Sequence, residues 1–369
     1  MNANRLERAR SLLREHGGGI LALTGGATMR YVTGHPFPAT DRLFLLLVPA
    51  QGPCAAVLPS FDVSGWRDIV SFECDVFGWD DTVGPARALE QAAARLPGAG
   101  RILVESLVFR YGEFRAVAQA FPGVEFGPAD ALVAALRMAK EREEIESIGE
   151  AARIAEISLE EVLPFARPGV QERELASRLC SALLLNGGEG ISFGPIVLSG
   201  PKSAMPHGVP DGRELRTGEL ILFDFGTSVR GYHCDITRTF VTGALPPDDR
   251  TRDVYETVLA GNLSGCAAAK PGATAHEVHW AAQEGLHRPR FDGYLKHRTG
   301  HGLGLDVHES PSIMDGNHEA LCPGTVFTVE PGLYLDGWGG VRIEDDVLIT
   351  ESSAEILTRF PRALRVVGG

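Results

Sequence analysis

The chain has 369 residues, of which 44% are hydrophobic and 22% are charged, a composition typical of a folded globular protein that is long enough for two domains. Its formal net charge is -13 and no dense run of lysines or arginines offsets it, so nucleic acid is excluded as an expected partner. No window approaches the roughly 20 apolar residues that span a bilayer, and no membrane segment is expected.

The first 135 residues predict an α/β domain. The segment MNANRLERARSLLREHGGG places Leu6, Ala9, Leu12 and Leu13 on one helical face among charged residues, which indicates an amphipathic helix and not a targeting peptide. Farther along, the apolar runs ILALTG, FLLLVPA and RILVESL alternate with the helical patterns GPARALEQAAARL and EFRAVAQAF. The six cysteines are widely separated and form no CxxC pair, which favours free thiols and a cytoplasmic protein.

A charged helical pattern opens the second expected domain, residues 136–369. In LRMAKEREEIESIGEAARIAEISLEEVL, apolar residues recur at helical spacing until Pro164 ends the pattern. Two pairs of segments then echo one another: ARPGVQEREL with AKPGATAHEV, and TGELILFDFG with PGTVFTVEPG. The first pair has a Pro-Gly turn before a helix and the second has a glycine before an apolar strand. We therefore expect an internal repeat of a helix followed by a strand.

A first pair of carboxylates lies in LILFDFGTSVRGYHCDITRTFV, where two strand-like runs flank the turn Val229–Gly231. Pairing centred between the first two residues of this turn puts Asp224 opposite Asp235, on the same face of the hairpin. Either aspartate alone could instead cap the turn or pair with Arg230 or Arg238. Two neighbouring carboxylates in such an apolar run are costly without a cation, so together they favour a metal site.

The second copy repeats this arrangement in VFTVEPGLYLDGWGGVRIEDDVLIT. Glu330 ends an apolar strand, and Glu344 lies in a second run after the glycine-rich turn Gly337–Gly340. For this hairpin alone, pairing with Arg342 or a lysine is a reasonable alternative. Two such hairpins offer four carboxylates, whose charge matches two divalent cations.

The stretch HRTGHGLGLDVHESP, His297–Pro311, holds three histidines among glycines and an aspartate. Such a cluster can arise by chance in a polar loop, but one neutral imidazole would complete the coordination of the two ions without changing its charge. Oxygen ligands with one imidazole favour Mn²⁺, and Co²⁺, Zn²⁺ and Fe²⁺ are compatible.

Six segments resemble the creatinase and methionine aminopeptidase superfamily, and within it the Xaa-Pro dipeptidases (prolidases) and Xaa-Pro aminopeptidases. They are ARPGVQEREL, SGPKSAMPHG, FDFGTSVRGYHCDITRTF, TGHGLGLDVHE, TVEPGLY and GGVRIEDDVLIT, in the order of that family. The resemblance implies an α+β catalytic domain of the pita-bread fold with an internal pseudo-twofold repeat, after the family's α/β N-terminal domain. It also implies five ligands for two divalent metal ions: Asp224, Asp235, His301, Glu330 and Glu344.

The resemblance also implies a mechanism. Asp235 and Glu344 would bridge the two ions, and a metal-bridging water or hydroxide would attack the scissile carbonyl. Glu330 would carry the proton of that nucleophile to the leaving proline nitrogen.

Further histidines acquire roles from the same resemblance, although each taken singly is an ordinary polar residue. His207 in MPHG and His308 in DVHE match histidines that hydrogen-bond the substrate and the tetrahedral intermediate. His297 matches a position that lines the proline side of the pocket. Arg342 lies two residues before Glu344 on the same strand face, where its guanidinium would orient a bridging carboxylate.

These residues predict a dinuclear metallopeptidase that acts on Xaa-Pro dipeptides or short peptides and forms a homodimer, as the family does. The bond before proline needs a specialised enzyme because the proline nitrogen has no N–H and its ring restricts the backbone. The compact N-terminal domain favours the dipeptidase. Arg42, in GHPFPATDRLFLLL, is a candidate clamp for the free proline carboxylate and would reach in from a partner subunit.

Two alternatives stay open. One is an Xaa-Pro aminopeptidase (aminopeptidase P) that accepts longer peptides, since the sequence does not reveal the far end of the pocket. The other is a non-catalytic pita-bread protein that binds peptides. A simple methionine aminopeptidase is disfavoured because its bacterial form lacks such an N-terminal domain, and creatinase-like hydrolysis because that relative lacks the metal ligands.

Overall fold

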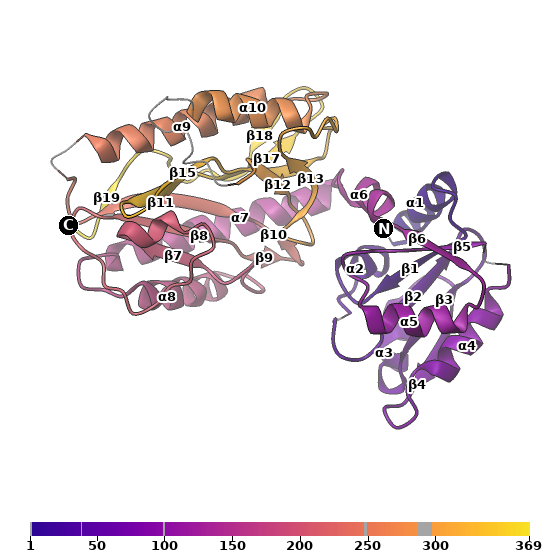
Figure 1. Ribbon diagram of the computed structural model, residues 1–369. Coiled ribbons are helices and arrows are strands. Elements are labelled where there is room, and N and C mark those ends of the chain that lie inside the picture. The colour runs from indigo at the N-terminus through magenta and orange to yellow at the C-terminus, as the bar shows by residue number, and fades with distance from the viewer. Residues whose placement is uncertain (1, 38, 99, 247–248, 287–296) are drawn as a thin grey trace. The chain divides into compact units, whose positions relative to one another are not determined.

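The computed structural model describes residues 2–37, 39–98, 100–246, 249–286 and 297–369, and the chain forms two compact units, Met1–Arg137 and Met138–Gly369 (Figure 1). Their division lies close to the boundary after residue 135 that the sequence predicts. Among the described residues, no helix is long and apolar enough to cross a membrane. All six cysteines are free thiols.

The first unit is built on a mixed sheet with the strand order β4-β3-β2-β1-β5-β6. Strand β1 is antiparallel to β2 and parallel to β5, so the sheet joins a hairpin to parallel strands. Every residue of β1, β2 and β3 is buried, as expected of continuous apolar runs covered on both faces. The strands are β1 (Ile20–Thr24), β2 (Leu45–Pro49), β3 (Cys54–Pro59), β4 (Cys74–Trp79), β5 (Arg101–Val104) and β6 (Glu125–Pro128).

Helices of the first unit cover this sheet. Buried Leu6, Ala9 and Leu13 confirm the amphipathic N-terminal helix, and Leu89 and Val117 pack from two other helices onto the strands. The expected α/β architecture is thus confirmed. The helices are α1 (Asn2–Glu15), α2 (Ala27–Thr33), η1 (Ser60–Asp62), α3 (Val63–Ile69), α4 (Ala86–Arg95), α5 (Tyr111–Ala120) and α6 (Asp130–Arg137).

The second unit contains two main sheets, each centred on one antiparallel strand pair. The first has the order β19-β11-β8-β7 and the second β13-β12-β14-β17-β18. Each central pair, β8-β11 or β14-β17, breaks and then continues as a two-stranded ribbon, β9-β10 or β15-β16. This duplication agrees with the internal repeat that the sequence predicts.

The strands of the first sheet and its ribbon are β7 (Ile196–Ser199), β8 (Leu220–Phe225), β9 (Ser228–Val229), β10 (Tyr232–His233), β11 (Ile236–Thr242) and β19 (Val366–Val367). Those of the second sheet and its ribbon are β12 (Gly300–Gly302), β13 (Glu309–Ile313), β14 (Val326–Val329), β15 (Gly332–Leu335), β16 (Gly339–Arg342), β17 (Asp345–Ile349) and β18 (Ala354–Ile356).

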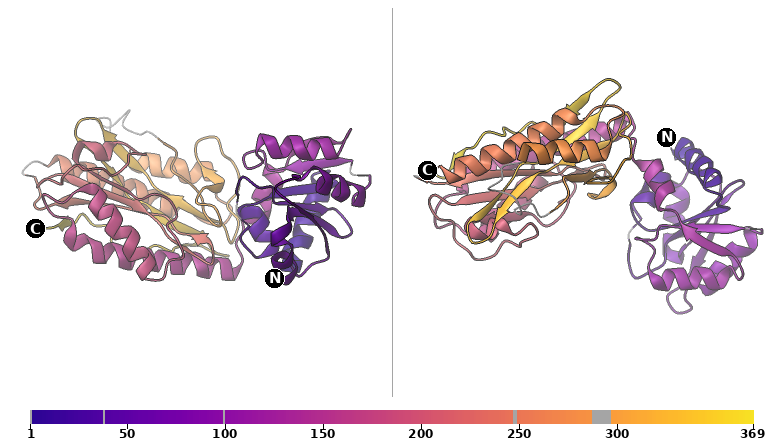
Figure 2. Two further views of the ribbon diagram at one scale, coloured as in Figure 1. Left: turned by 90° about the horizontal axis from the view of Figure 1, so that it is seen from below. Right: turned by 45° about the horizontal axis from the view of Figure 1, so that its top comes forward.

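Two helices pack on each sheet of the second unit, so that the strands lie between helical layers (Figure 1). Helices α7 and α8 share a core with β8 and β11, while α9 and α10 share one with β14 and β17. Figure 2 shows α9 and α10 side by side along the second sheet. The helices are α7 (Arg142–Val162), η2 (Leu163–Phe165), α8 (Glu172–Leu185), η3 (Gly200–Ala204), α9 (Arg250–Ala268) and α10 (Ala275–Leu286).

The register of the first hairpin differs from the predicted one. Asp224 pairs with Thr237 and not with Asp235, because the two-residue turn is formed by Arg230 and Gly231, both with positive φ. This turn lies one residue later than predicted, which moves the cross-strand partner by two positions. A shift of two keeps every side chain on its predicted face, so Asp224 and Asp235 still project to the same side.

A glycine at the break of the first ladder should be sensitive to substitution. A Cβ at Gly226 would lie 1.9 Å from the Cys234 carbonyl oxygen and 2.7 Å from the Ser192 Oγ. We expect Gly226→Ala to lower the free energy of unfolding of the metal-free protein by about 2 to 3 kcal/mol, measured by urea denaturation. The control is Gly149→Ala in α7, where no atom lies within 4 Å of the added Cβ and a stabilisation of about 0.5 to 1 kcal/mol is expected. Equal midpoints for the two variants would contradict this account.

Candidate metal centre

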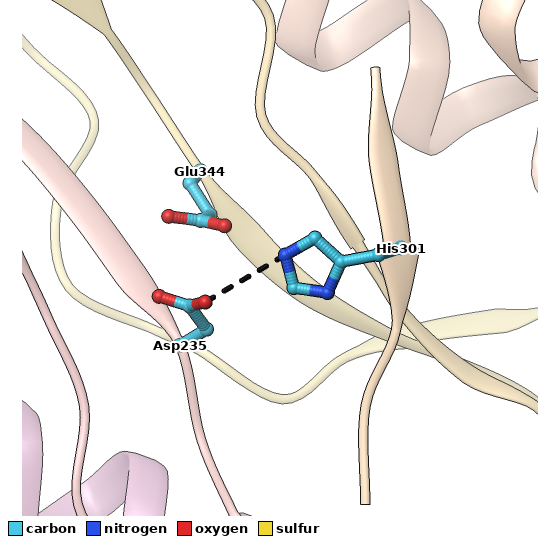
Figure 3. A group of neighbouring side chains, drawn as sticks. All are labelled: Asp235, His301 and Glu344. Atoms are coloured by element: carbon cyan, nitrogen blue, oxygen red, sulfur yellow. Dashed lines mark ion pairs between the residues drawn. The ribbon is translucent and has the colours of Figure 1, made fainter. Parts of the chain in front are cut away.

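Three buried side chains from separate elements converge between the two ladders of the second unit. Asp235 precedes β11, His301 lies in β12, and Glu344 lies between β16 and β17. One ligand atom from each, two carboxylate oxygens and an imidazole nitrogen, lies within 4.8 Å of the others. Figure 3 shows the three side chains pointing toward one another. The structure therefore brings together three of the five predicted ligands as one compact group.

The tautomer of His301 presents the lone pair of one ring nitrogen to this group. Its Nδ1–H donates to the Gly302 carbonyl at 3.1 Å, which leaves Nε2 as the acceptor nitrogen. Nε2 lies 3.8 Å from Asp235 Oδ2 and 3.4 Å from Glu330 Oε1. Burial, assisted by His308, lowers the pKa of His301 to about 3, so the imidazole is neutral. A neutral ring oriented by a backbone carbonyl is the form in which histidine binds metals.

The two carboxylates of the group are destabilised by burial and by neighbouring negative charges. Burial and the charge of Glu344 hold the pKa of Asp235 well above its ordinary value, while burial and the charge of Glu330 do the same for Glu344. Within the described residues, no lysine or arginine forms an ion pair with Asp235 or Glu344, and Asp235 Oδ1 is buried without a hydrogen-bond partner. A divalent cation would satisfy that orphaned oxygen and offset the repulsion, so the donor set fits a metal ion.

Asp224 is held differently, by a buried arginine. Arg342 donates from Nη2 to Asp224 Oδ2, and from Nε to Thr237 Oγ1 at 3.1 Å. Thr237 Oγ1 in turn donates to Glu344 Oε2 at 2.6 Å. Arg342 thus orients Asp224 directly and Glu344 through one hydroxyl, and it offsets one of the four negative charges.

Glu330, directly after β14, lies beside two histidines. Its Oε1 is 3.4 Å from His301 Nε2, and its Oε2 is 3.9 Å from His297 Nδ1. Burial and the nearby charge of Asp224 raise the pKa of Glu330 to about 7, against the opposing charge of Arg342. A carboxyl group with this pKa exchanges protons near neutral pH.

The remaining predicted histidines surround this group to different degrees. His297 Nε2 accepts a hydrogen bond from Tyr334 Oη at 2.6 Å, and burial lowers the pKa of His297 to about 4. The ring of half-buried His308 meets that of His301 edge-on, with centroids 4.0 Å apart. His207 lines an open hollow of the same unit. Met205, residues of η3 and residues of the β15-β16 turn line it as well.

Arg42, the predicted carboxylate clamp, belongs to the first unit. Its guanidinium forms two hydrogen bonds to the carboxylate of Asp81, 2.9 and 2.8 Å long, at the protein surface. It also lies over the ring of Phe61, at the edge of a hollow that His35 and Trp66 line as well. Its predicted contact with substrate stays a prediction.

Sequence reasoning missed several partners of the predicted residues. Tyr334 receives a hydrogen bond from Arg342 Nη1 at 2.7 Å and donates to His297. Asp346 accepts the backbone N–H of Asp235 at 3.2 Å. Tyr334 follows Glu330 by four residues, within the quoted segment TVEPGLY, and this position was the only signal for it.

Comparisons with known proteins cover both units. Residues 146–351 match the model of metallopeptidase family M24, and residues 5–139 match the creatinase/prolidase N-terminal domain. The chain is 31% identical to the structure of an Xaa-Pro dipeptidase from Bacillus anthracis, with a TM-score of 0.90 over 99% of this chain and 100% of that one.

Two further similar proteins are named for different activities. An Xaa-Pro dipeptidase from Pyrococcus furiosus is 40% identical over 240 residues, which are 65% of this chain and 68% of that protein. The structure of an X-Pro aminopeptidase from Thermotoga maritima is 31% identical, with a TM-score of 0.83 over 97% of this chain and 100% of that one.

The raised pKa of Glu330 predicts a pH dependence of the metal-free protein. Folding favours protonated Glu330, so its contribution to stability is full below the unfolded pKa near 4.5 and is lost as the pH rises toward 7. The free energy of unfolding should fall by on the order of 3 kcal/mol over this interval. Glu330→Gln, which cannot ionise, should show a correspondingly flatter curve in urea denaturation between pH 4.5 and 7.5. Parallel curves for the wild type and the variant would contradict the assignment.

Proposed function

Because the chain belongs to metallopeptidase family M24, we propose that it is an Xaa-Pro dipeptidase, or prolidase, which hydrolyses the peptide bond before proline. The observation that carries this proposal is the buried convergence of Asp235, His301 and Glu344. Similarity along the whole chain to a protein named Xaa-Pro dipeptidase supports the substrate class. Residues 1–135 would form the N-terminal domain and residues 136–369 the catalytic domain.

Two divalent ions would occupy the centre, with Mn²⁺ favoured and Co²⁺, Zn²⁺ or Fe²⁺ compatible with the same ligands. When bound, such ions polarise a carbonyl group and lower the pKa of a water molecule, so that water attacks near neutral pH. Asp235 and Glu344 would serve both ions. The remaining ligands would be Asp224, His301 and Glu330.

Protons would move through Glu330. Its carboxylate would accept a proton from the attacking water and pass it on. The acceptor would be the proline nitrogen, which must gain a proton as the peptide bond breaks. Protonation lets this nitrogen leave as a neutral amine and not as an amide anion.

The histidines and Arg342 would hold the substrate and the ligands in place. His308 and His207 would donate hydrogen bonds to the substrate and to the oxyanion that develops during attack. His297, whose ring orientation is fixed by Tyr334, would line the proline side of the pocket. Arg342 would orient Asp224 and, through Thr237, Glu344.

An Xaa-Pro aminopeptidase is the second candidate, and the similarity to the Thermotoga maritima structure favours it. The two functions differ only in whether the pocket recognises a free proline carboxylate or leaves room for a longer chain. We place the dipeptidase first because the Bacillus anthracis structure has the higher TM-score over the whole chain. A peptide-binding protein without catalysis comes last, since all five ligand positions hold donor side chains.

A cytoplasmic location and a homodimer complete the proposal. All six cysteines are free thiols, as a reducing compartment favours. In a dimer, Arg42 would reach the proline carboxylate of the partner subunit's substrate. To do so it would have to exchange its surface pair with Asp81, and an unchanged dipeptide KM in Arg42→Ala would reject this role.

Metal stoichiometry tests the ligand assignment. Wild-type protein loaded with Mn²⁺ and freed of excess metal should retain two ions, Asp224→Asn one, and Asp235→Asn none, because of these two aspartates only Asp235 is assigned to both ions. Atomic absorption gives the count, and Mn²⁺ should raise the melting temperature in the same order.

The matched control is Glu351→Gln, an exposed carboxylate a few residues beyond Glu344, which should retain both ions. Equal stoichiometry in Asp235→Asn and the wild type would remove Asp235 from the site.

Activity tests the reaction itself. Chelated enzyme should be inactive, and added Mn²⁺ should restore proline release from Ala-Pro at least about tenfold faster than hydrolysis of Ala-Pro-Ala. Glu330→Gln should lower kcat by about 10²- to 10⁴-fold, the usual contribution of a general acid and base. Efficient tripeptide cleavage would make the enzyme an aminopeptidase P, and inactivity on both substrates would favour the binding protein.

A further inference from the structure

A lysine and a glutamate form a buried ion pair next to His308. Lys140 Nζ donates to Glu309 Oε1 at 2.6 Å, and the two side chains are 1% and 9% exposed. Removing both charges from water is costly, and an apolar pair of similar volume often stabilises a fold equally well. Stability alone therefore does not account for a charged pair at this position.

The lysine is fixed to the strand that leads to Glu330. The N–H of Lys140 donates to the Gly324 carbonyl at 2.9 Å, and Ala139 forms an antiparallel bridge with Thr325, directly before β14. A Cβ at Gly324 would lie 2.8 Å from the Lys140 carbonyl oxygen, so the two backbones are in close contact. Lys140 is thus held against the strand that supplies a proposed metal ligand.

The glutamate lies at the base of the hairpin that carries two histidines of the site. Glu309, the first residue of β13, pairs with Gly302 of β12. A Cβ at Gly304 would lie 2.6 Å from Glu309 Oε1, so the loop between these strands packs directly on the carboxylate. His301 precedes Gly302 and His308 precedes Glu309, and the two imidazole centroids are 4.0 Å apart. The Glu309 carboxylate therefore contacts the short loop whose last residue is His308.

We infer that the Lys140–Glu309 pair positions the imidazole of His308, an inference that rests on the role of His308 in the proposed function. Lys140 is bonded to the segment before β14, and Glu309 lies at the base of the β12-β13 hairpin. A short charge-assisted hydrogen bond between them holds the start of β13 at a defined distance from that segment. An apolar contact of the same volume is not directional and defines this distance less well. Lys140 and Glu309 act as positioning residues and do not touch the substrate.

A double-mutant cycle with His308 tests the inference by steady-state kinetics on Ala-Pro. In the Mn²⁺-loaded enzyme, Lys140→Met should lower kcat about ten- to hundredfold, as expected for a misplaced catalytic group. The same change in a His308→Ala background should lower kcat further by no more than about twofold, because the imidazole on which the pair acts is gone. Equal losses in the two backgrounds would overturn the inference, as would the absence of any loss.

A second variant keeps the test valid if Lys140→Met, which leaves Glu309 buried and unpaired, does not fold. Lys140→Met with Glu309→Leu replaces the ion pair by an apolar pair, so its melting temperature and metal content should match those of the wild type. Its kcat should still be about ten- to hundredfold low. Full activity of this double variant would show that the pair serves stability alone and would overturn the inference.

Lys270→Met is the matched control, because it removes an exposed lysine of the same unit. It should change neither kcat nor the melting temperature. Glu309→Gln keeps an oxygen that can accept from Lys140 and should lose less activity than Lys140→Met does.

Histidine NMR spectra give a readout that does not depend on activity. In the Zn²⁺-loaded full chain, the ring signals of His308, assigned by their absence in His308→Ala, should shift in Lys140→Met and in the apolar double variant. The signals of exposed His16 should not shift. Unchanged His308 signals would overturn the inference. Failure of the wild type to cleave Ala-Pro would refute the proposed function, and the NMR comparison would still decide whether the pair positions His308.

Discussion

Repulsion between buried carboxylates at the junction of the two ladders governs the chemistry of the second unit. Burial and the charge of Glu344 raise the pKa of Asp235, and burial and the charge of Glu330 raise that of Glu344. Among the described residues, neither carboxylate forms an ion pair with a lysine or arginine. Buried Arg342, at the same junction, pairs with Asp224 instead. A chain that keeps such a cluster in its core gives up stability in the metal-free state, and a multivalent cation recovers that loss. The same carboxylates thus explain why the metal-free fold loses stability and why the site fits a metal ion.

The breaks in the ladders explain why the acids meet there. Each central strand pair stops pairing for a few residues before its ribbon begins, which frees backbone groups to bond across the repeat. The N–H of Asp235 donates to Asp346 in the other half, and the N–H of Glu344 donates to the carbonyl of Thr237 at 3.2 Å. Asp235 and Glu344 are therefore each hydrogen-bonded, through the backbone N–H, to the half to which they do not belong.

The local sequence pattern is sufficient to predict the carboxylates of the site but not the residues that contact them. Carboxylates that end apolar runs are conspicuous, so Asp224 and Glu330 stand out in the sequence. The cross-strand pairing of Asp224 depends on the turn at Arg230 and Gly231. The sequence pattern predicts this turn one residue too early. Tyr334 and Thr237 carry no such pattern, because their roles arise from segments that meet only in the folded unit. Long-range contacts of this kind leave no periodic trace in the sequence.

The wide spacing of Asp235, His301 and Glu344 along the chain has a consequence for the order of assembly. Glu344 is supplied by the segment before β17, near the end of the chain, and joining it to Asp235 closes a long loop. Such non-local contacts form late in folding, because their entropic cost must be met first. A nascent chain on the ribosome therefore holds an incomplete donor set until the last strands emerge. A cation that binds all three side chains therefore requires a chain that has folded as far as β17.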